Sequence, residues 1–468
     1  MIEPTTWAQE QFGGIDLRDA RRTARLVRMA ASVAASPAGT VTEVFDDDAE
    51  RQGAYDLLES EHVDADALER GVGEVLGAKC AQEKHLIVVI DESTLSFSDF
   101  YGKRGLGKVG NYRADGAGLY VLSALALNAC GVPLGLLRQV MWSRPRHRPK
   151  NRPSAHARPV AEKETRHWLD AIKTSASRVA VGTSKTKITY VLDRQGDCDA
   201  VLCALGATGH RFVVRCRNRF AYVGKRGALL RSLIAQRPVL GEYDVEVAGR
   251  PGRTARVATL RVRAIDVVVM MKDPVSKKKV ELNIAALNAK EIGNLPPGEE
   301  RLDWLVLTNQ RIESFADARA ALATYTLRWR IEEFHKTWKS GHCRVEESQL
   351  RGEQAVRKWA LILAAVACRI ERLKLLARET PNAPADIEFS ENELHALILL
   401  KRRSKKKSEI IPDEVPTISQ ATIWLAEIGG YTGKSSGGPP GSITLSRGLF
   451  KLRAAADAIA AFLAEKKR

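Results

Sequence analysis

Two aspartates and one glutamate are the residues of this 468-residue chain whose types and settings best fit catalysis. Asp91 directly follows a short apolar run at residues 85–90, and Asp193 directly follows a second one at residues 187–192. Such β-branched runs are typical of buried strands, and groups just beyond strand ends line the functional crevice of an open α/β sheet. An aspartate at the end of a single strand more often caps a turn than acts in catalysis. The third residue, Glu332, lies in a predicted helix.

That helix, at residues 314–339, separates its polar residues from its apolar ones. At about 100° per residue, one quadrant carries a carboxylate, three cations and a phenol. This polar stripe consists of Tyr325, Arg328, Glu332, Lys336 and Lys339. The opposite stripe predicts contact with a core and consists of Leu327, Ile331, Phe334 and Trp338. The alternative is a solvated face with i,i+4 salt bridges, although such a face rarely needs an aligned tyrosine.

Three carboxylates of this kind suit metal-dependent cleavage of a phosphodiester bond. The reaction needs an activated water and a stabilised leaving oxygen, and two divalent ions about 3.5–4 Å apart supply both. Hard ions such as Mg²⁺, with Mn²⁺ as a substitute, prefer carboxylate oxygens and relieve the repulsion among them. We therefore expect Asp91, Asp193 and Glu332 to hold two ions. The cations of the polar stripe suit contact with phosphate.

The charge of the chain predicts a polyanionic partner. Lys and Arg number 73 against 56 Asp and Glu, a formal net charge of +17. A field of this sign attracts nucleic acid, with a merely basic soluble protein as the alternative. Arginines cluster in a predicted helix at residues 15–31, and we expect Arg21, Arg22 and Arg25 to contact the nucleic-acid backbone. The basic segments 143–158 and 401–407 remain open between that role and a solvated loop.

The pattern along the chain predicts a mixed α/β fold with helices at both ends. Residues 1–70 look helical, strands and helices follow, and residues 220–300 alternate like small β-hairpins before a core strand at residues 302–308. This order predicts an α/β domain interrupted by a mostly β insertion. The chain has no apolar run of about 18 residues, no signal peptide and no CxxC among its seven cysteines, so we expect a reduced, cytoplasmic protein.

The polar stripe also matches a known signature. The Y-(2)-R-(3)-E-(6)-K spacing of Tyr325, Arg328, Glu332 and Lys339 resembles that of the insertion-sequence-four family of DDE transposases. The string RWRIEEFHKTWK is similar to the cut-and-paste type found in bacterial transposon five. Further similarities extend over most of the chain, in the strings DARRTARLV, QGAYDLL, DESTLSF, LDRQGD, FVVRCR and LDWLVLT. The sequence departs from the family after Asp91, where Glu-Ser replaces two hydroxyl residues.

The resemblance implies an architecture of three parts. A ribonuclease-H-like catalytic domain with a β-rich insertion at about 220–300 would occupy residues 71–372. A helical DNA-binding domain at residues 1–70 and a helical dimerisation domain at residues 373–468 would flank it. The last of these matches the family least. The resemblance also implies that Arg215 contacts DNA and that Trp304 stacks on a flipped base.

The implied activity is cut-and-paste DNA transposition in the bacterial cytoplasm, associated with the nucleoid. Water nicks one strand at the transposon end, and the freed 3′ hydroxyl attacks the other strand to form a hairpin. A second water opens the hairpin, and the 3′ ends then join target DNA. The partners are double-stranded DNA and a second copy of the chain in a synaptic homodimer. Two alternatives are a catalytically silent regulator derived from a transposase and a structure-specific nuclease.

Overall fold

The computed structural model describes most of the chain. The described residues are 3–99, 102, 104–110, 116–147, 153–154, 157–181, 185–247, 249, 253–404, 411, 414–433 and 438–465. Parts of the two basic segments, at residues 148–152, 155–156 and 405–407, lie outside them. In the part of the chain that the structure describes, every helix is too short or too polar to span a lipid bilayer.

These residues form two compact units, each built from separate stretches of chain. Unit 1 combines Met1–Gln82, Glu92–Lys150 and Arg330–Arg468, and unit 2 combines Glu83–Asp91 and Asn151–Trp329. The chain therefore passes from one unit to the other inside a strand, between Asp91 and Glu92, and again between Trp329 and Arg330 at the start of a helix. Both units contain helices and strands, so the predicted mixed α/β fold is confirmed.

Unit 2 is organised around a mixed sheet. Its strands follow the order β1-β5-β6-β12-β11-β10-β7-β8, and β9 pairs with β10. Their bounds are β1 (His85–Phe97), β5 (Lys187–Leu192), β6 (Arg211–Arg215), β7 (Phe220–Val223), β8 (Arg226–Leu229), β9 (Gly241–Val247), β10 (Arg256–Lys272), β11 (Lys279–Glu291) and β12 (Asp303–Thr308). β5 runs parallel to β1 and to β6, whereas β12 is antiparallel to β6. The strands predicted at residues 187–192 and 302–308 are confirmed.

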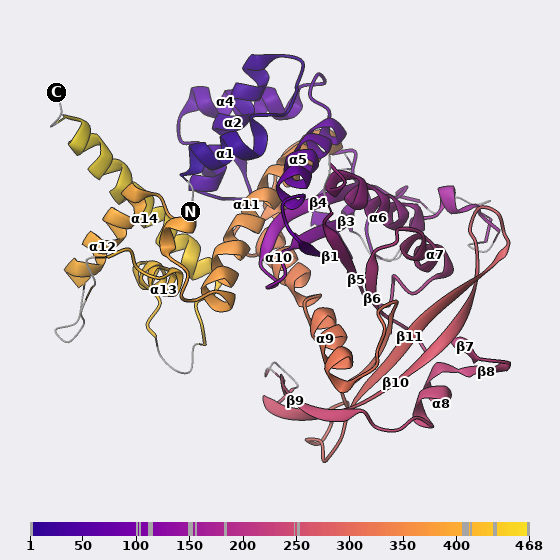
Figure 1. Cartoon of the computed structure of the whole chain (residues 1–468). Helices are drawn as coiled ribbons and strands as arrows, with labels where there is room; N and C mark the ends of the chain where they lie inside the picture. The colour runs from indigo at the N-terminus through magenta and orange to yellow at the C-terminus, as the bar shows by residue number, and fades with distance from the viewer. Residues whose placement is uncertain are drawn as a thin grey trace. The chain divides into compact units, whose positions relative to one another are not determined.

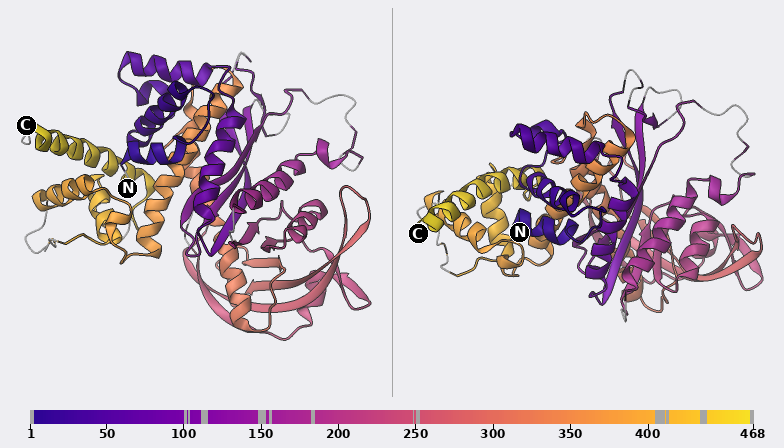
Figure 2. Two further views of the ribbon diagram at one scale, coloured as in Figure 1. Left: turned by 45° about the horizontal axis from the view of Figure 1, so that its top comes forward. Right: turned by 90° about the horizontal axis from the view of Figure 1, so that it is seen from above.

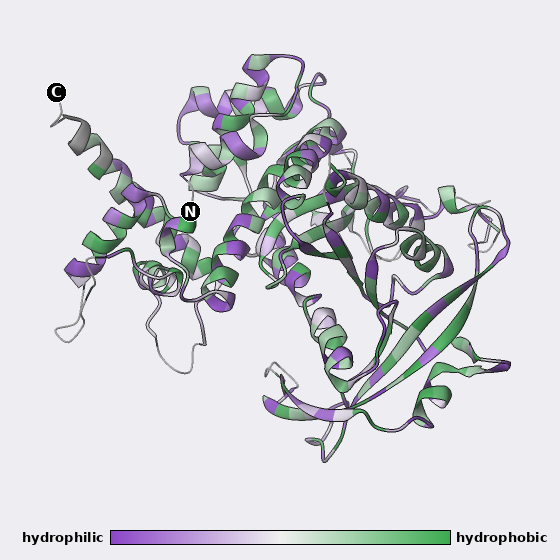
Figure 3. Cartoon of the chain, viewed as in Figure 1, coloured by the Kyte–Doolittle hydropathy of each residue, from purple (hydrophilic) through white to green (hydrophobic). Residues whose placement is uncertain are grey.

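The β-rich insertion is dominated by one long hairpin. β10 and β11 pair antiparallel from Leu260 opposite Glu291 to Lys272 opposite Lys279 (Figure 1). Buried residues alternate with more exposed ones along most of β10, and both hydrophobic and hydrophilic residues lie along the hairpin (Figure 3). This period of two is expected of a strand with one face in a core. Here α7 and α8 contact both strands of the hairpin.

The described helices of unit 2 range from a single 3-10 turn to a helix of 15 residues. They are η1 (Val160–Glu162), α6 (Thr165–Val179), α7 (Asp199–Ala207), α8 (Leu230–Ala235) and α9 (Phe315–Thr326). α9 begins with a capping box, in which Ser314 and Asp317 each bond to the main chain of the other. It contacts β5 and β6 and so approaches the strand that Asp193 follows.

Unit 1 is mainly helical and is organised around α11, a helix of 27 residues. Its helices are α1 (Pro4–Phe12), α2 (Ala20–Ala35), α3 (Val41–Val44), α4 (Asp48–Glu59), α5 (Ala65–Cys80), α10 (Trp329–Lys339), η2 (Val345–Glu347), α11 (Glu353–Glu379), η3 (Ala385–Ile387), α12 (Glu391–Ser404), α13 (Ile418–Ile428) and α14 (Ser442–Glu465). Its strands are β2 (Gly107–Lys108), β3 (Ala117–Leu127) and β4 (Pro133–Trp142). α11 contacts α2, α4 and α5, as well as α13 and α14 (Figure 2).

The basic N-terminal helix begins later than its sequence pattern predicts. α2 spans Ala20–Ala35, whereas the pattern places it at residues 15–31. The carboxylate of Asp19 accepts the Arg21 N–H at 2.9 Å and caps the helix there. Arg18, one residue earlier, has a positive φ of 61° that no helix continues through.

Candidate active site

Asp91 and Asp193 occupy corresponding positions on two neighbouring strands of unit 2. β1 and β5 run parallel, and the last residues paired between them are Ile90 and Leu192. The next residue on each strand is the aspartate, so both carboxylates start from the same edge of the pairing. The apolar runs before them are buried, which fixes both main chains at this edge. β1 does not end at Asp91, as its sequence suggests, but continues to Phe97.

An ion pair joins Asp91 to the first cation of the polar stripe. Nη1 of Arg328 lies 3.3 Å from Oδ2 of Asp91, and both side chains are largely buried. The same guanidinium lies 5.3 Å from the centroid of the Trp329 ring. Shielding from water strengthens the attraction of such a pair. Arg328 is therefore a cation held directly beside a candidate catalytic carboxylate.

Asp193 opens a tight turn. One of its carboxylate oxygens accepts the Gln195 N–H at 2.7 Å, and its carbonyl oxygen accepts the Gly196 N–H at 3.1 Å. A Cβ atom at Gly196 would lie 2.8 Å from Cβ of Leu192, so the turn needs glycine there. Asp193 thus caps a turn with one oxygen, the role that was the alternative to catalysis. The turn also fixes the direction in which the carboxylate leaves the strand.

The predicted helix at residues 314–339 is two helices. α9 ends at Thr326 and α10 begins at Trp329. The N–H groups of Leu327 and Arg328 bond to carbonyls three residues back, those of Thr324 and Tyr325, at 3.2 and 3.0 Å. Such i→i−3 bonds tighten the chain and end the regular α-helix. Tyr325 and Glu332 therefore stand on different helices rather than on one continuous face.

Glu332 is half-buried on α10, within unit 1. The apolar side of α10 packs as predicted: Ile331, Phe334 and Trp338 are fully buried, and the indole N–H of Trp338 donates to the Ala360 carbonyl at 3.0 Å. This packing fixes the rotation of the helix and hence the side from which Glu332 projects.

The two lysines of the polar stripe lie further along α10. Lys336 is exposed, and Lys339 lies 3.6 Å from the carboxylate of Glu346. Of the three predicted carboxylates, unit 2 brings Asp91 and Asp193 together, and Glu332 belongs to unit 1. Among the described residues, no three His, Cys, Asp or Glu side chains form a group that could hold a metal ion.

Arg215 and Trp304 lie on the neighbouring strands β6 and β12. Arg215 is opposite Val306, two residues along from Trp304. Trp304 is half-buried, and its ring stands edge-on to the buried ring of Tyr325, with centroids 6.0 Å apart. A flat, partly accessible indole braced from one side is a surface on which another ring can stack.

The three arginines predicted to contact DNA from α2 differ in how far they are exposed to solvent. Arg21 is 92% exposed and lies 3.2 Å from Asp19, and this contact lowers the pKa of the aspartate. Arg22 and Arg25 are partly covered, and the Arg25 guanidinium fills the space beside Gly53 of α4. The opposite face of α2, which includes Leu26, is buried. Arg21 is the member of the predicted set that is most accessible to a partner.

Two features of unit 2 have no counterpart in the sequence predictions. Trp329 is 53% exposed beside Arg328, although a tryptophan at a helix start usually finds cover. Its only signal was its place inside the string RWRIEEFHKTWK. The second feature is Arg219, which bonds to two aspartates that follow Asp193 in sequence. Nothing in the spacing predicts that contact.

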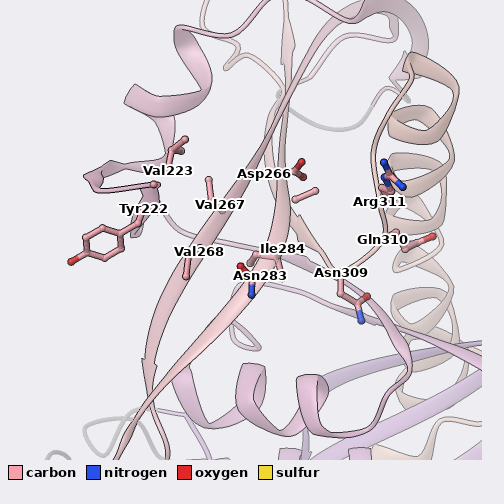
Figure 4. Close-up of a pocket in the computed structure, with 12 residues that line it drawn as sticks. Tyr222, Val223, Asp266, Val267, Val268, Asn283, Ile284, Asn309, Gln310 and Arg311 are labelled. Carbon is pink, nitrogen blue, oxygen red and sulfur yellow. The ribbon is translucent and has the colours of Figure 1, made fainter.

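A pocket of about 310 Å³ opens in the β-rich insertion, but its polar groups do not converge. Tyr222 and Arg311 lie on opposite sides of it (Figure 4). The Asn309 amide is engaged by the main chain of His210 and Phe212. None of the predicted site residues is among the residues that line this pocket.

Two protein-family models match the chain. The model described as "Transposase DNA-binding" matches residues 4–63, which include all of α2. The model described as "Transposase DDE domain" matches residues 134–369, which is 236 of the 468 residues. Asp193 and Glu332 lie inside the second match, and Asp91 lies before it.

Proposed function

Because this chain belongs to the family of transposases with a DDE domain, we propose that it is a cut-and-paste DNA transposase whose catalytic carboxylates are Asp91, Asp193 and Glu332. The observation that carries the proposal is the pair of aspartates that directly follow the paired parallel strands β1 and β5. Three residues before Glu332, the chain leaves the unit that holds this pair. The proposal requires that Glu332, on α10, complete the site with this pair.

The proposed cofactor is Mg²⁺, with Mn²⁺ as a substitute and two ions at the site. The donor set fits, because carboxylate oxygens from adjacent strands are the ligands that hard divalent ions prefer. When bound, such ions supply an activated water and stabilise the leaving oxygen. The side chains of the protein have separate tasks: Arg328, beside Asp91, offsets the charge of a phosphate, and Lys336 and Lys339 hold the DNA backbone.

The proposed reaction passes through a DNA hairpin. A hairpin at the transposon end is tight, and flipping one base out of the stack relieves it at a cost of a few kcal/mol. Stacking on Trp304 would offset roughly 1–3 kcal/mol of that cost. Tyr325, edge-on to Trp304, would hold that ring in place, and Arg215 would contact the nearby backbone.

We propose the same three-part organisation that the sequence predicts. Residues 1–70 bind the transposon end through Arg21, Arg22 and Arg25, and residues 71–372 form a ribonuclease-H-like domain. The parallel arrangement of β1, β5 and β6 supports that fold. Residues 373–468 pair two copies in the synaptic complex. Exposed apolar side chains on three helices of this region support the last point: Leu399, Ile423, Ile443 and Phe450.

Cleavage of DNA that carries the inverted repeats flanking the gene tests the proposal. We expect the wild-type protein to nick, form hairpins and join ends only with Mg²⁺ or Mn²⁺. Asp193→Asn and Glu332→Ala should each lower the cleavage rate by at least about a hundredfold, because charge stabilisation in the transition state is lost. Their binding to end DNA in gel shifts should stay within about twofold of wild type.

Asp266→Asn is the matched control, because Asp266 is an exposed carboxylate on β10 of the same unit. It should cleave like the wild type. Cleavage that survives in Glu332→Ala would remove that residue from the proposed site. Cleavage without joined products would favour a structure-specific nuclease, and end binding without any cleavage would favour a silent regulator.

A further inference from the structure

Arg219 connects the segment after β6 to the turn that follows Asp193. Its Nη1 donates to Asp197 at 2.7 Å, and its Nη2 donates to Asp199 at 2.8 Å. One guanidinium thus spans two carboxylates that lie four and six residues beyond Asp193. Arginine suits this task because its planar fork presents parallel donors in a fixed geometry.

The Asp197 and Asp199 carboxylates each also accept a hydrogen bond from a main-chain N–H group. Asp197 accepts the Arg217 N–H at 2.7 Å, and Asp199 accepts the Lys272 N–H at 3.0 Å. The first bond reaches the chain just beyond β6, and the second reaches the end of β10. The segment 194–199 is therefore fastened to two strands of the sheet, and Arg219 is the side chain common to both carboxylates.

The ion pair between Arg219 and Asp197 is largely shielded from solvent. The Asp197 side chain is 3% exposed and that of Arg219 is 17% exposed. Exposed ion pairs contribute little to stability, whereas a charge left alone at a buried position is strongly unfavourable. The Asp197–Arg219 pair is consequently expected to stay intact whenever unit 2 is folded.

We propose that Arg219 is a positioning residue for Asp193, which keeps the turn at residues 194–199 fixed so that the Asp193 carboxylate is ready to bind a divalent ion. This inference rests on the proposed function. Arg219 and the two aspartates that it bonds form a clamp on the turn that Asp193 opens. In this turn the Gln195 N–H already donates to one oxygen of the Asp193 carboxylate. Arg219 engages Asp197 and Asp199, so that these neighbouring carboxylates do not compete with Asp193 for the ion.

The test measures Mn²⁺ binding and main-chain exchange in full-length, DNA-free protein. Electron paramagnetic resonance of free Mn²⁺ gives the affinity, and amide hydrogen exchange followed by mass spectrometry reports on residues 194–199. Arg219→Ala should weaken Mn²⁺ binding by about tenfold, the lower end of the range for a group bonded directly to a metal ligand, because Arg219 acts on Asp193 only through the turn. Its turn should exchange faster than that of the wild type. Arg219→Lys, which keeps the charge but not the fork, should fall between them.

Arg261→Ala is the matched control, because Arg261 pairs with Glu242 at 2.7 Å in the same unit and far along the sheet order from β5. It should leave both readouts unchanged. If Arg219→Ala does not fold, the double variant Arg219→Leu with Asp197→Asn removes the clamp without a buried lone charge. Unchanged Mn²⁺ affinity and exchange in a folded clamp variant would overturn the inference, as would a wild type that binds no Mn²⁺.

The two proposals can fail separately. If the wild-type protein binds Mn²⁺ more tightly than Arg219→Ala but never cleaves DNA, the positioning role of Arg219 stands and the transposase proposal fails. If wild type and Arg219→Ala cleave DNA with the same dependence on Mn²⁺, the transposase proposal stands and the positioning role of Arg219 fails.

Discussion

Among single residues, His335 shows how strongly the packing of α10 determines side-chain chemistry. Its ring lies against those of Phe334 and Trp338, which stack on each other, and Nε2 lies 3.3 Å from the Ser123 hydroxyl. Burial, with a smaller effect of Lys339, lowers its pKa to about 3. The folded protein therefore holds this histidine neutral, whereas the unfolded chain protonates it near pH 6.5.

This shift predicts a loss of stability in mild acid. Below pH 6.5 His335 binds a proton in the unfolded chain but not in the folded protein. The free energy of unfolding therefore falls as pH drops from 6.5 toward 3. Between pH 7 and pH 5, His335 should account for about 2 kcal/mol of that loss. Urea denaturation of His335→Gln should show a pH dependence weaker by this amount. The remainder includes His342, whose pKa burial lowers to about 4.

The exposed His62 supplies the control for the replacement itself, since His62→Gln makes the same change at a position outside the packing of α10. An equal loss of stability in wild type and His335→Gln would show that His335 does not stay neutral in the folded protein.

Among the elements, α10 is attached to α11 by buried polar contacts as well as by its apolar face. Thr337 donates to Glu371 at 2.5 Å, and Glu371 pairs with Lys374 on the next turn of α11. Lys374 also lies 3.4 Å from Glu333. Glu371 and Lys374 are both buried, so these charges are tolerable only as a set.

Breaking this set should cost far more than breaking an exposed pair. Glu371→Ala leaves the buried Lys374 ammonium with only the more distant, partly exposed Glu333 and should lower the free energy of unfolding by about 3 kcal/mol. The double variant Glu371→Leu with Lys374→Met should recover most of the loss. Glu347→Ala, which breaks the i,i+3 pair with Arg344 at the surface, should cost about 1 kcal/mol or less. Denaturant unfolding measures all three, and a small effect of Glu371→Ala alone would contradict the prediction.

The elements also show what the sequence could and could not predict. The strand at residues 187–192 was predicted to the residue, because an apolar run of that length between charged residues has few other solutions. The break between α9 and α10 was not, since Leu327 and Arg328 are both compatible with a helix and only their i→i−3 bonds interrupt it. Arg219 was missed for another reason: its partners lie 20 and 22 residues earlier, and only the fold brings them within reach.

For the whole molecule, the net charge of +17 predicts DNA binding that weakens steeply with salt. The location of the responsible arginines can be tested with two similar side chains. Arg21 is 92% exposed and pairs with Asp19 in α2, and Arg311 is 82% exposed and pairs with Glu313 in unit 2. Arg21→Ala should reduce the slope of log K against log salt for end DNA by about one, as loss of one phosphate contact does. Arg311→Ala should leave the slope unchanged.

Fluorescence anisotropy over a range of KCl concentrations gives these slopes. Equal slopes for the wild type and Arg21→Ala would exclude Arg21 from the DNA contact. A reduced slope in Arg311→Ala would instead indicate that end DNA also lies along unit 2.

The interleaving of the two units constrains how this gene can be divided. Because unit 2 takes Glu83–Asp91 from one part of the chain and Asn151–Trp329 from another, no single crossover between two related genes exchanges it whole. Truncation cannot isolate unit 2 either. An N-terminal truncation that removes Glu92–Lys150 also removes Glu83–Asp91, which belongs to unit 2. Chimeras that exchange unit 2 therefore need four coordinated junctions, and one of them falls in the middle of β1, immediately after Asp91.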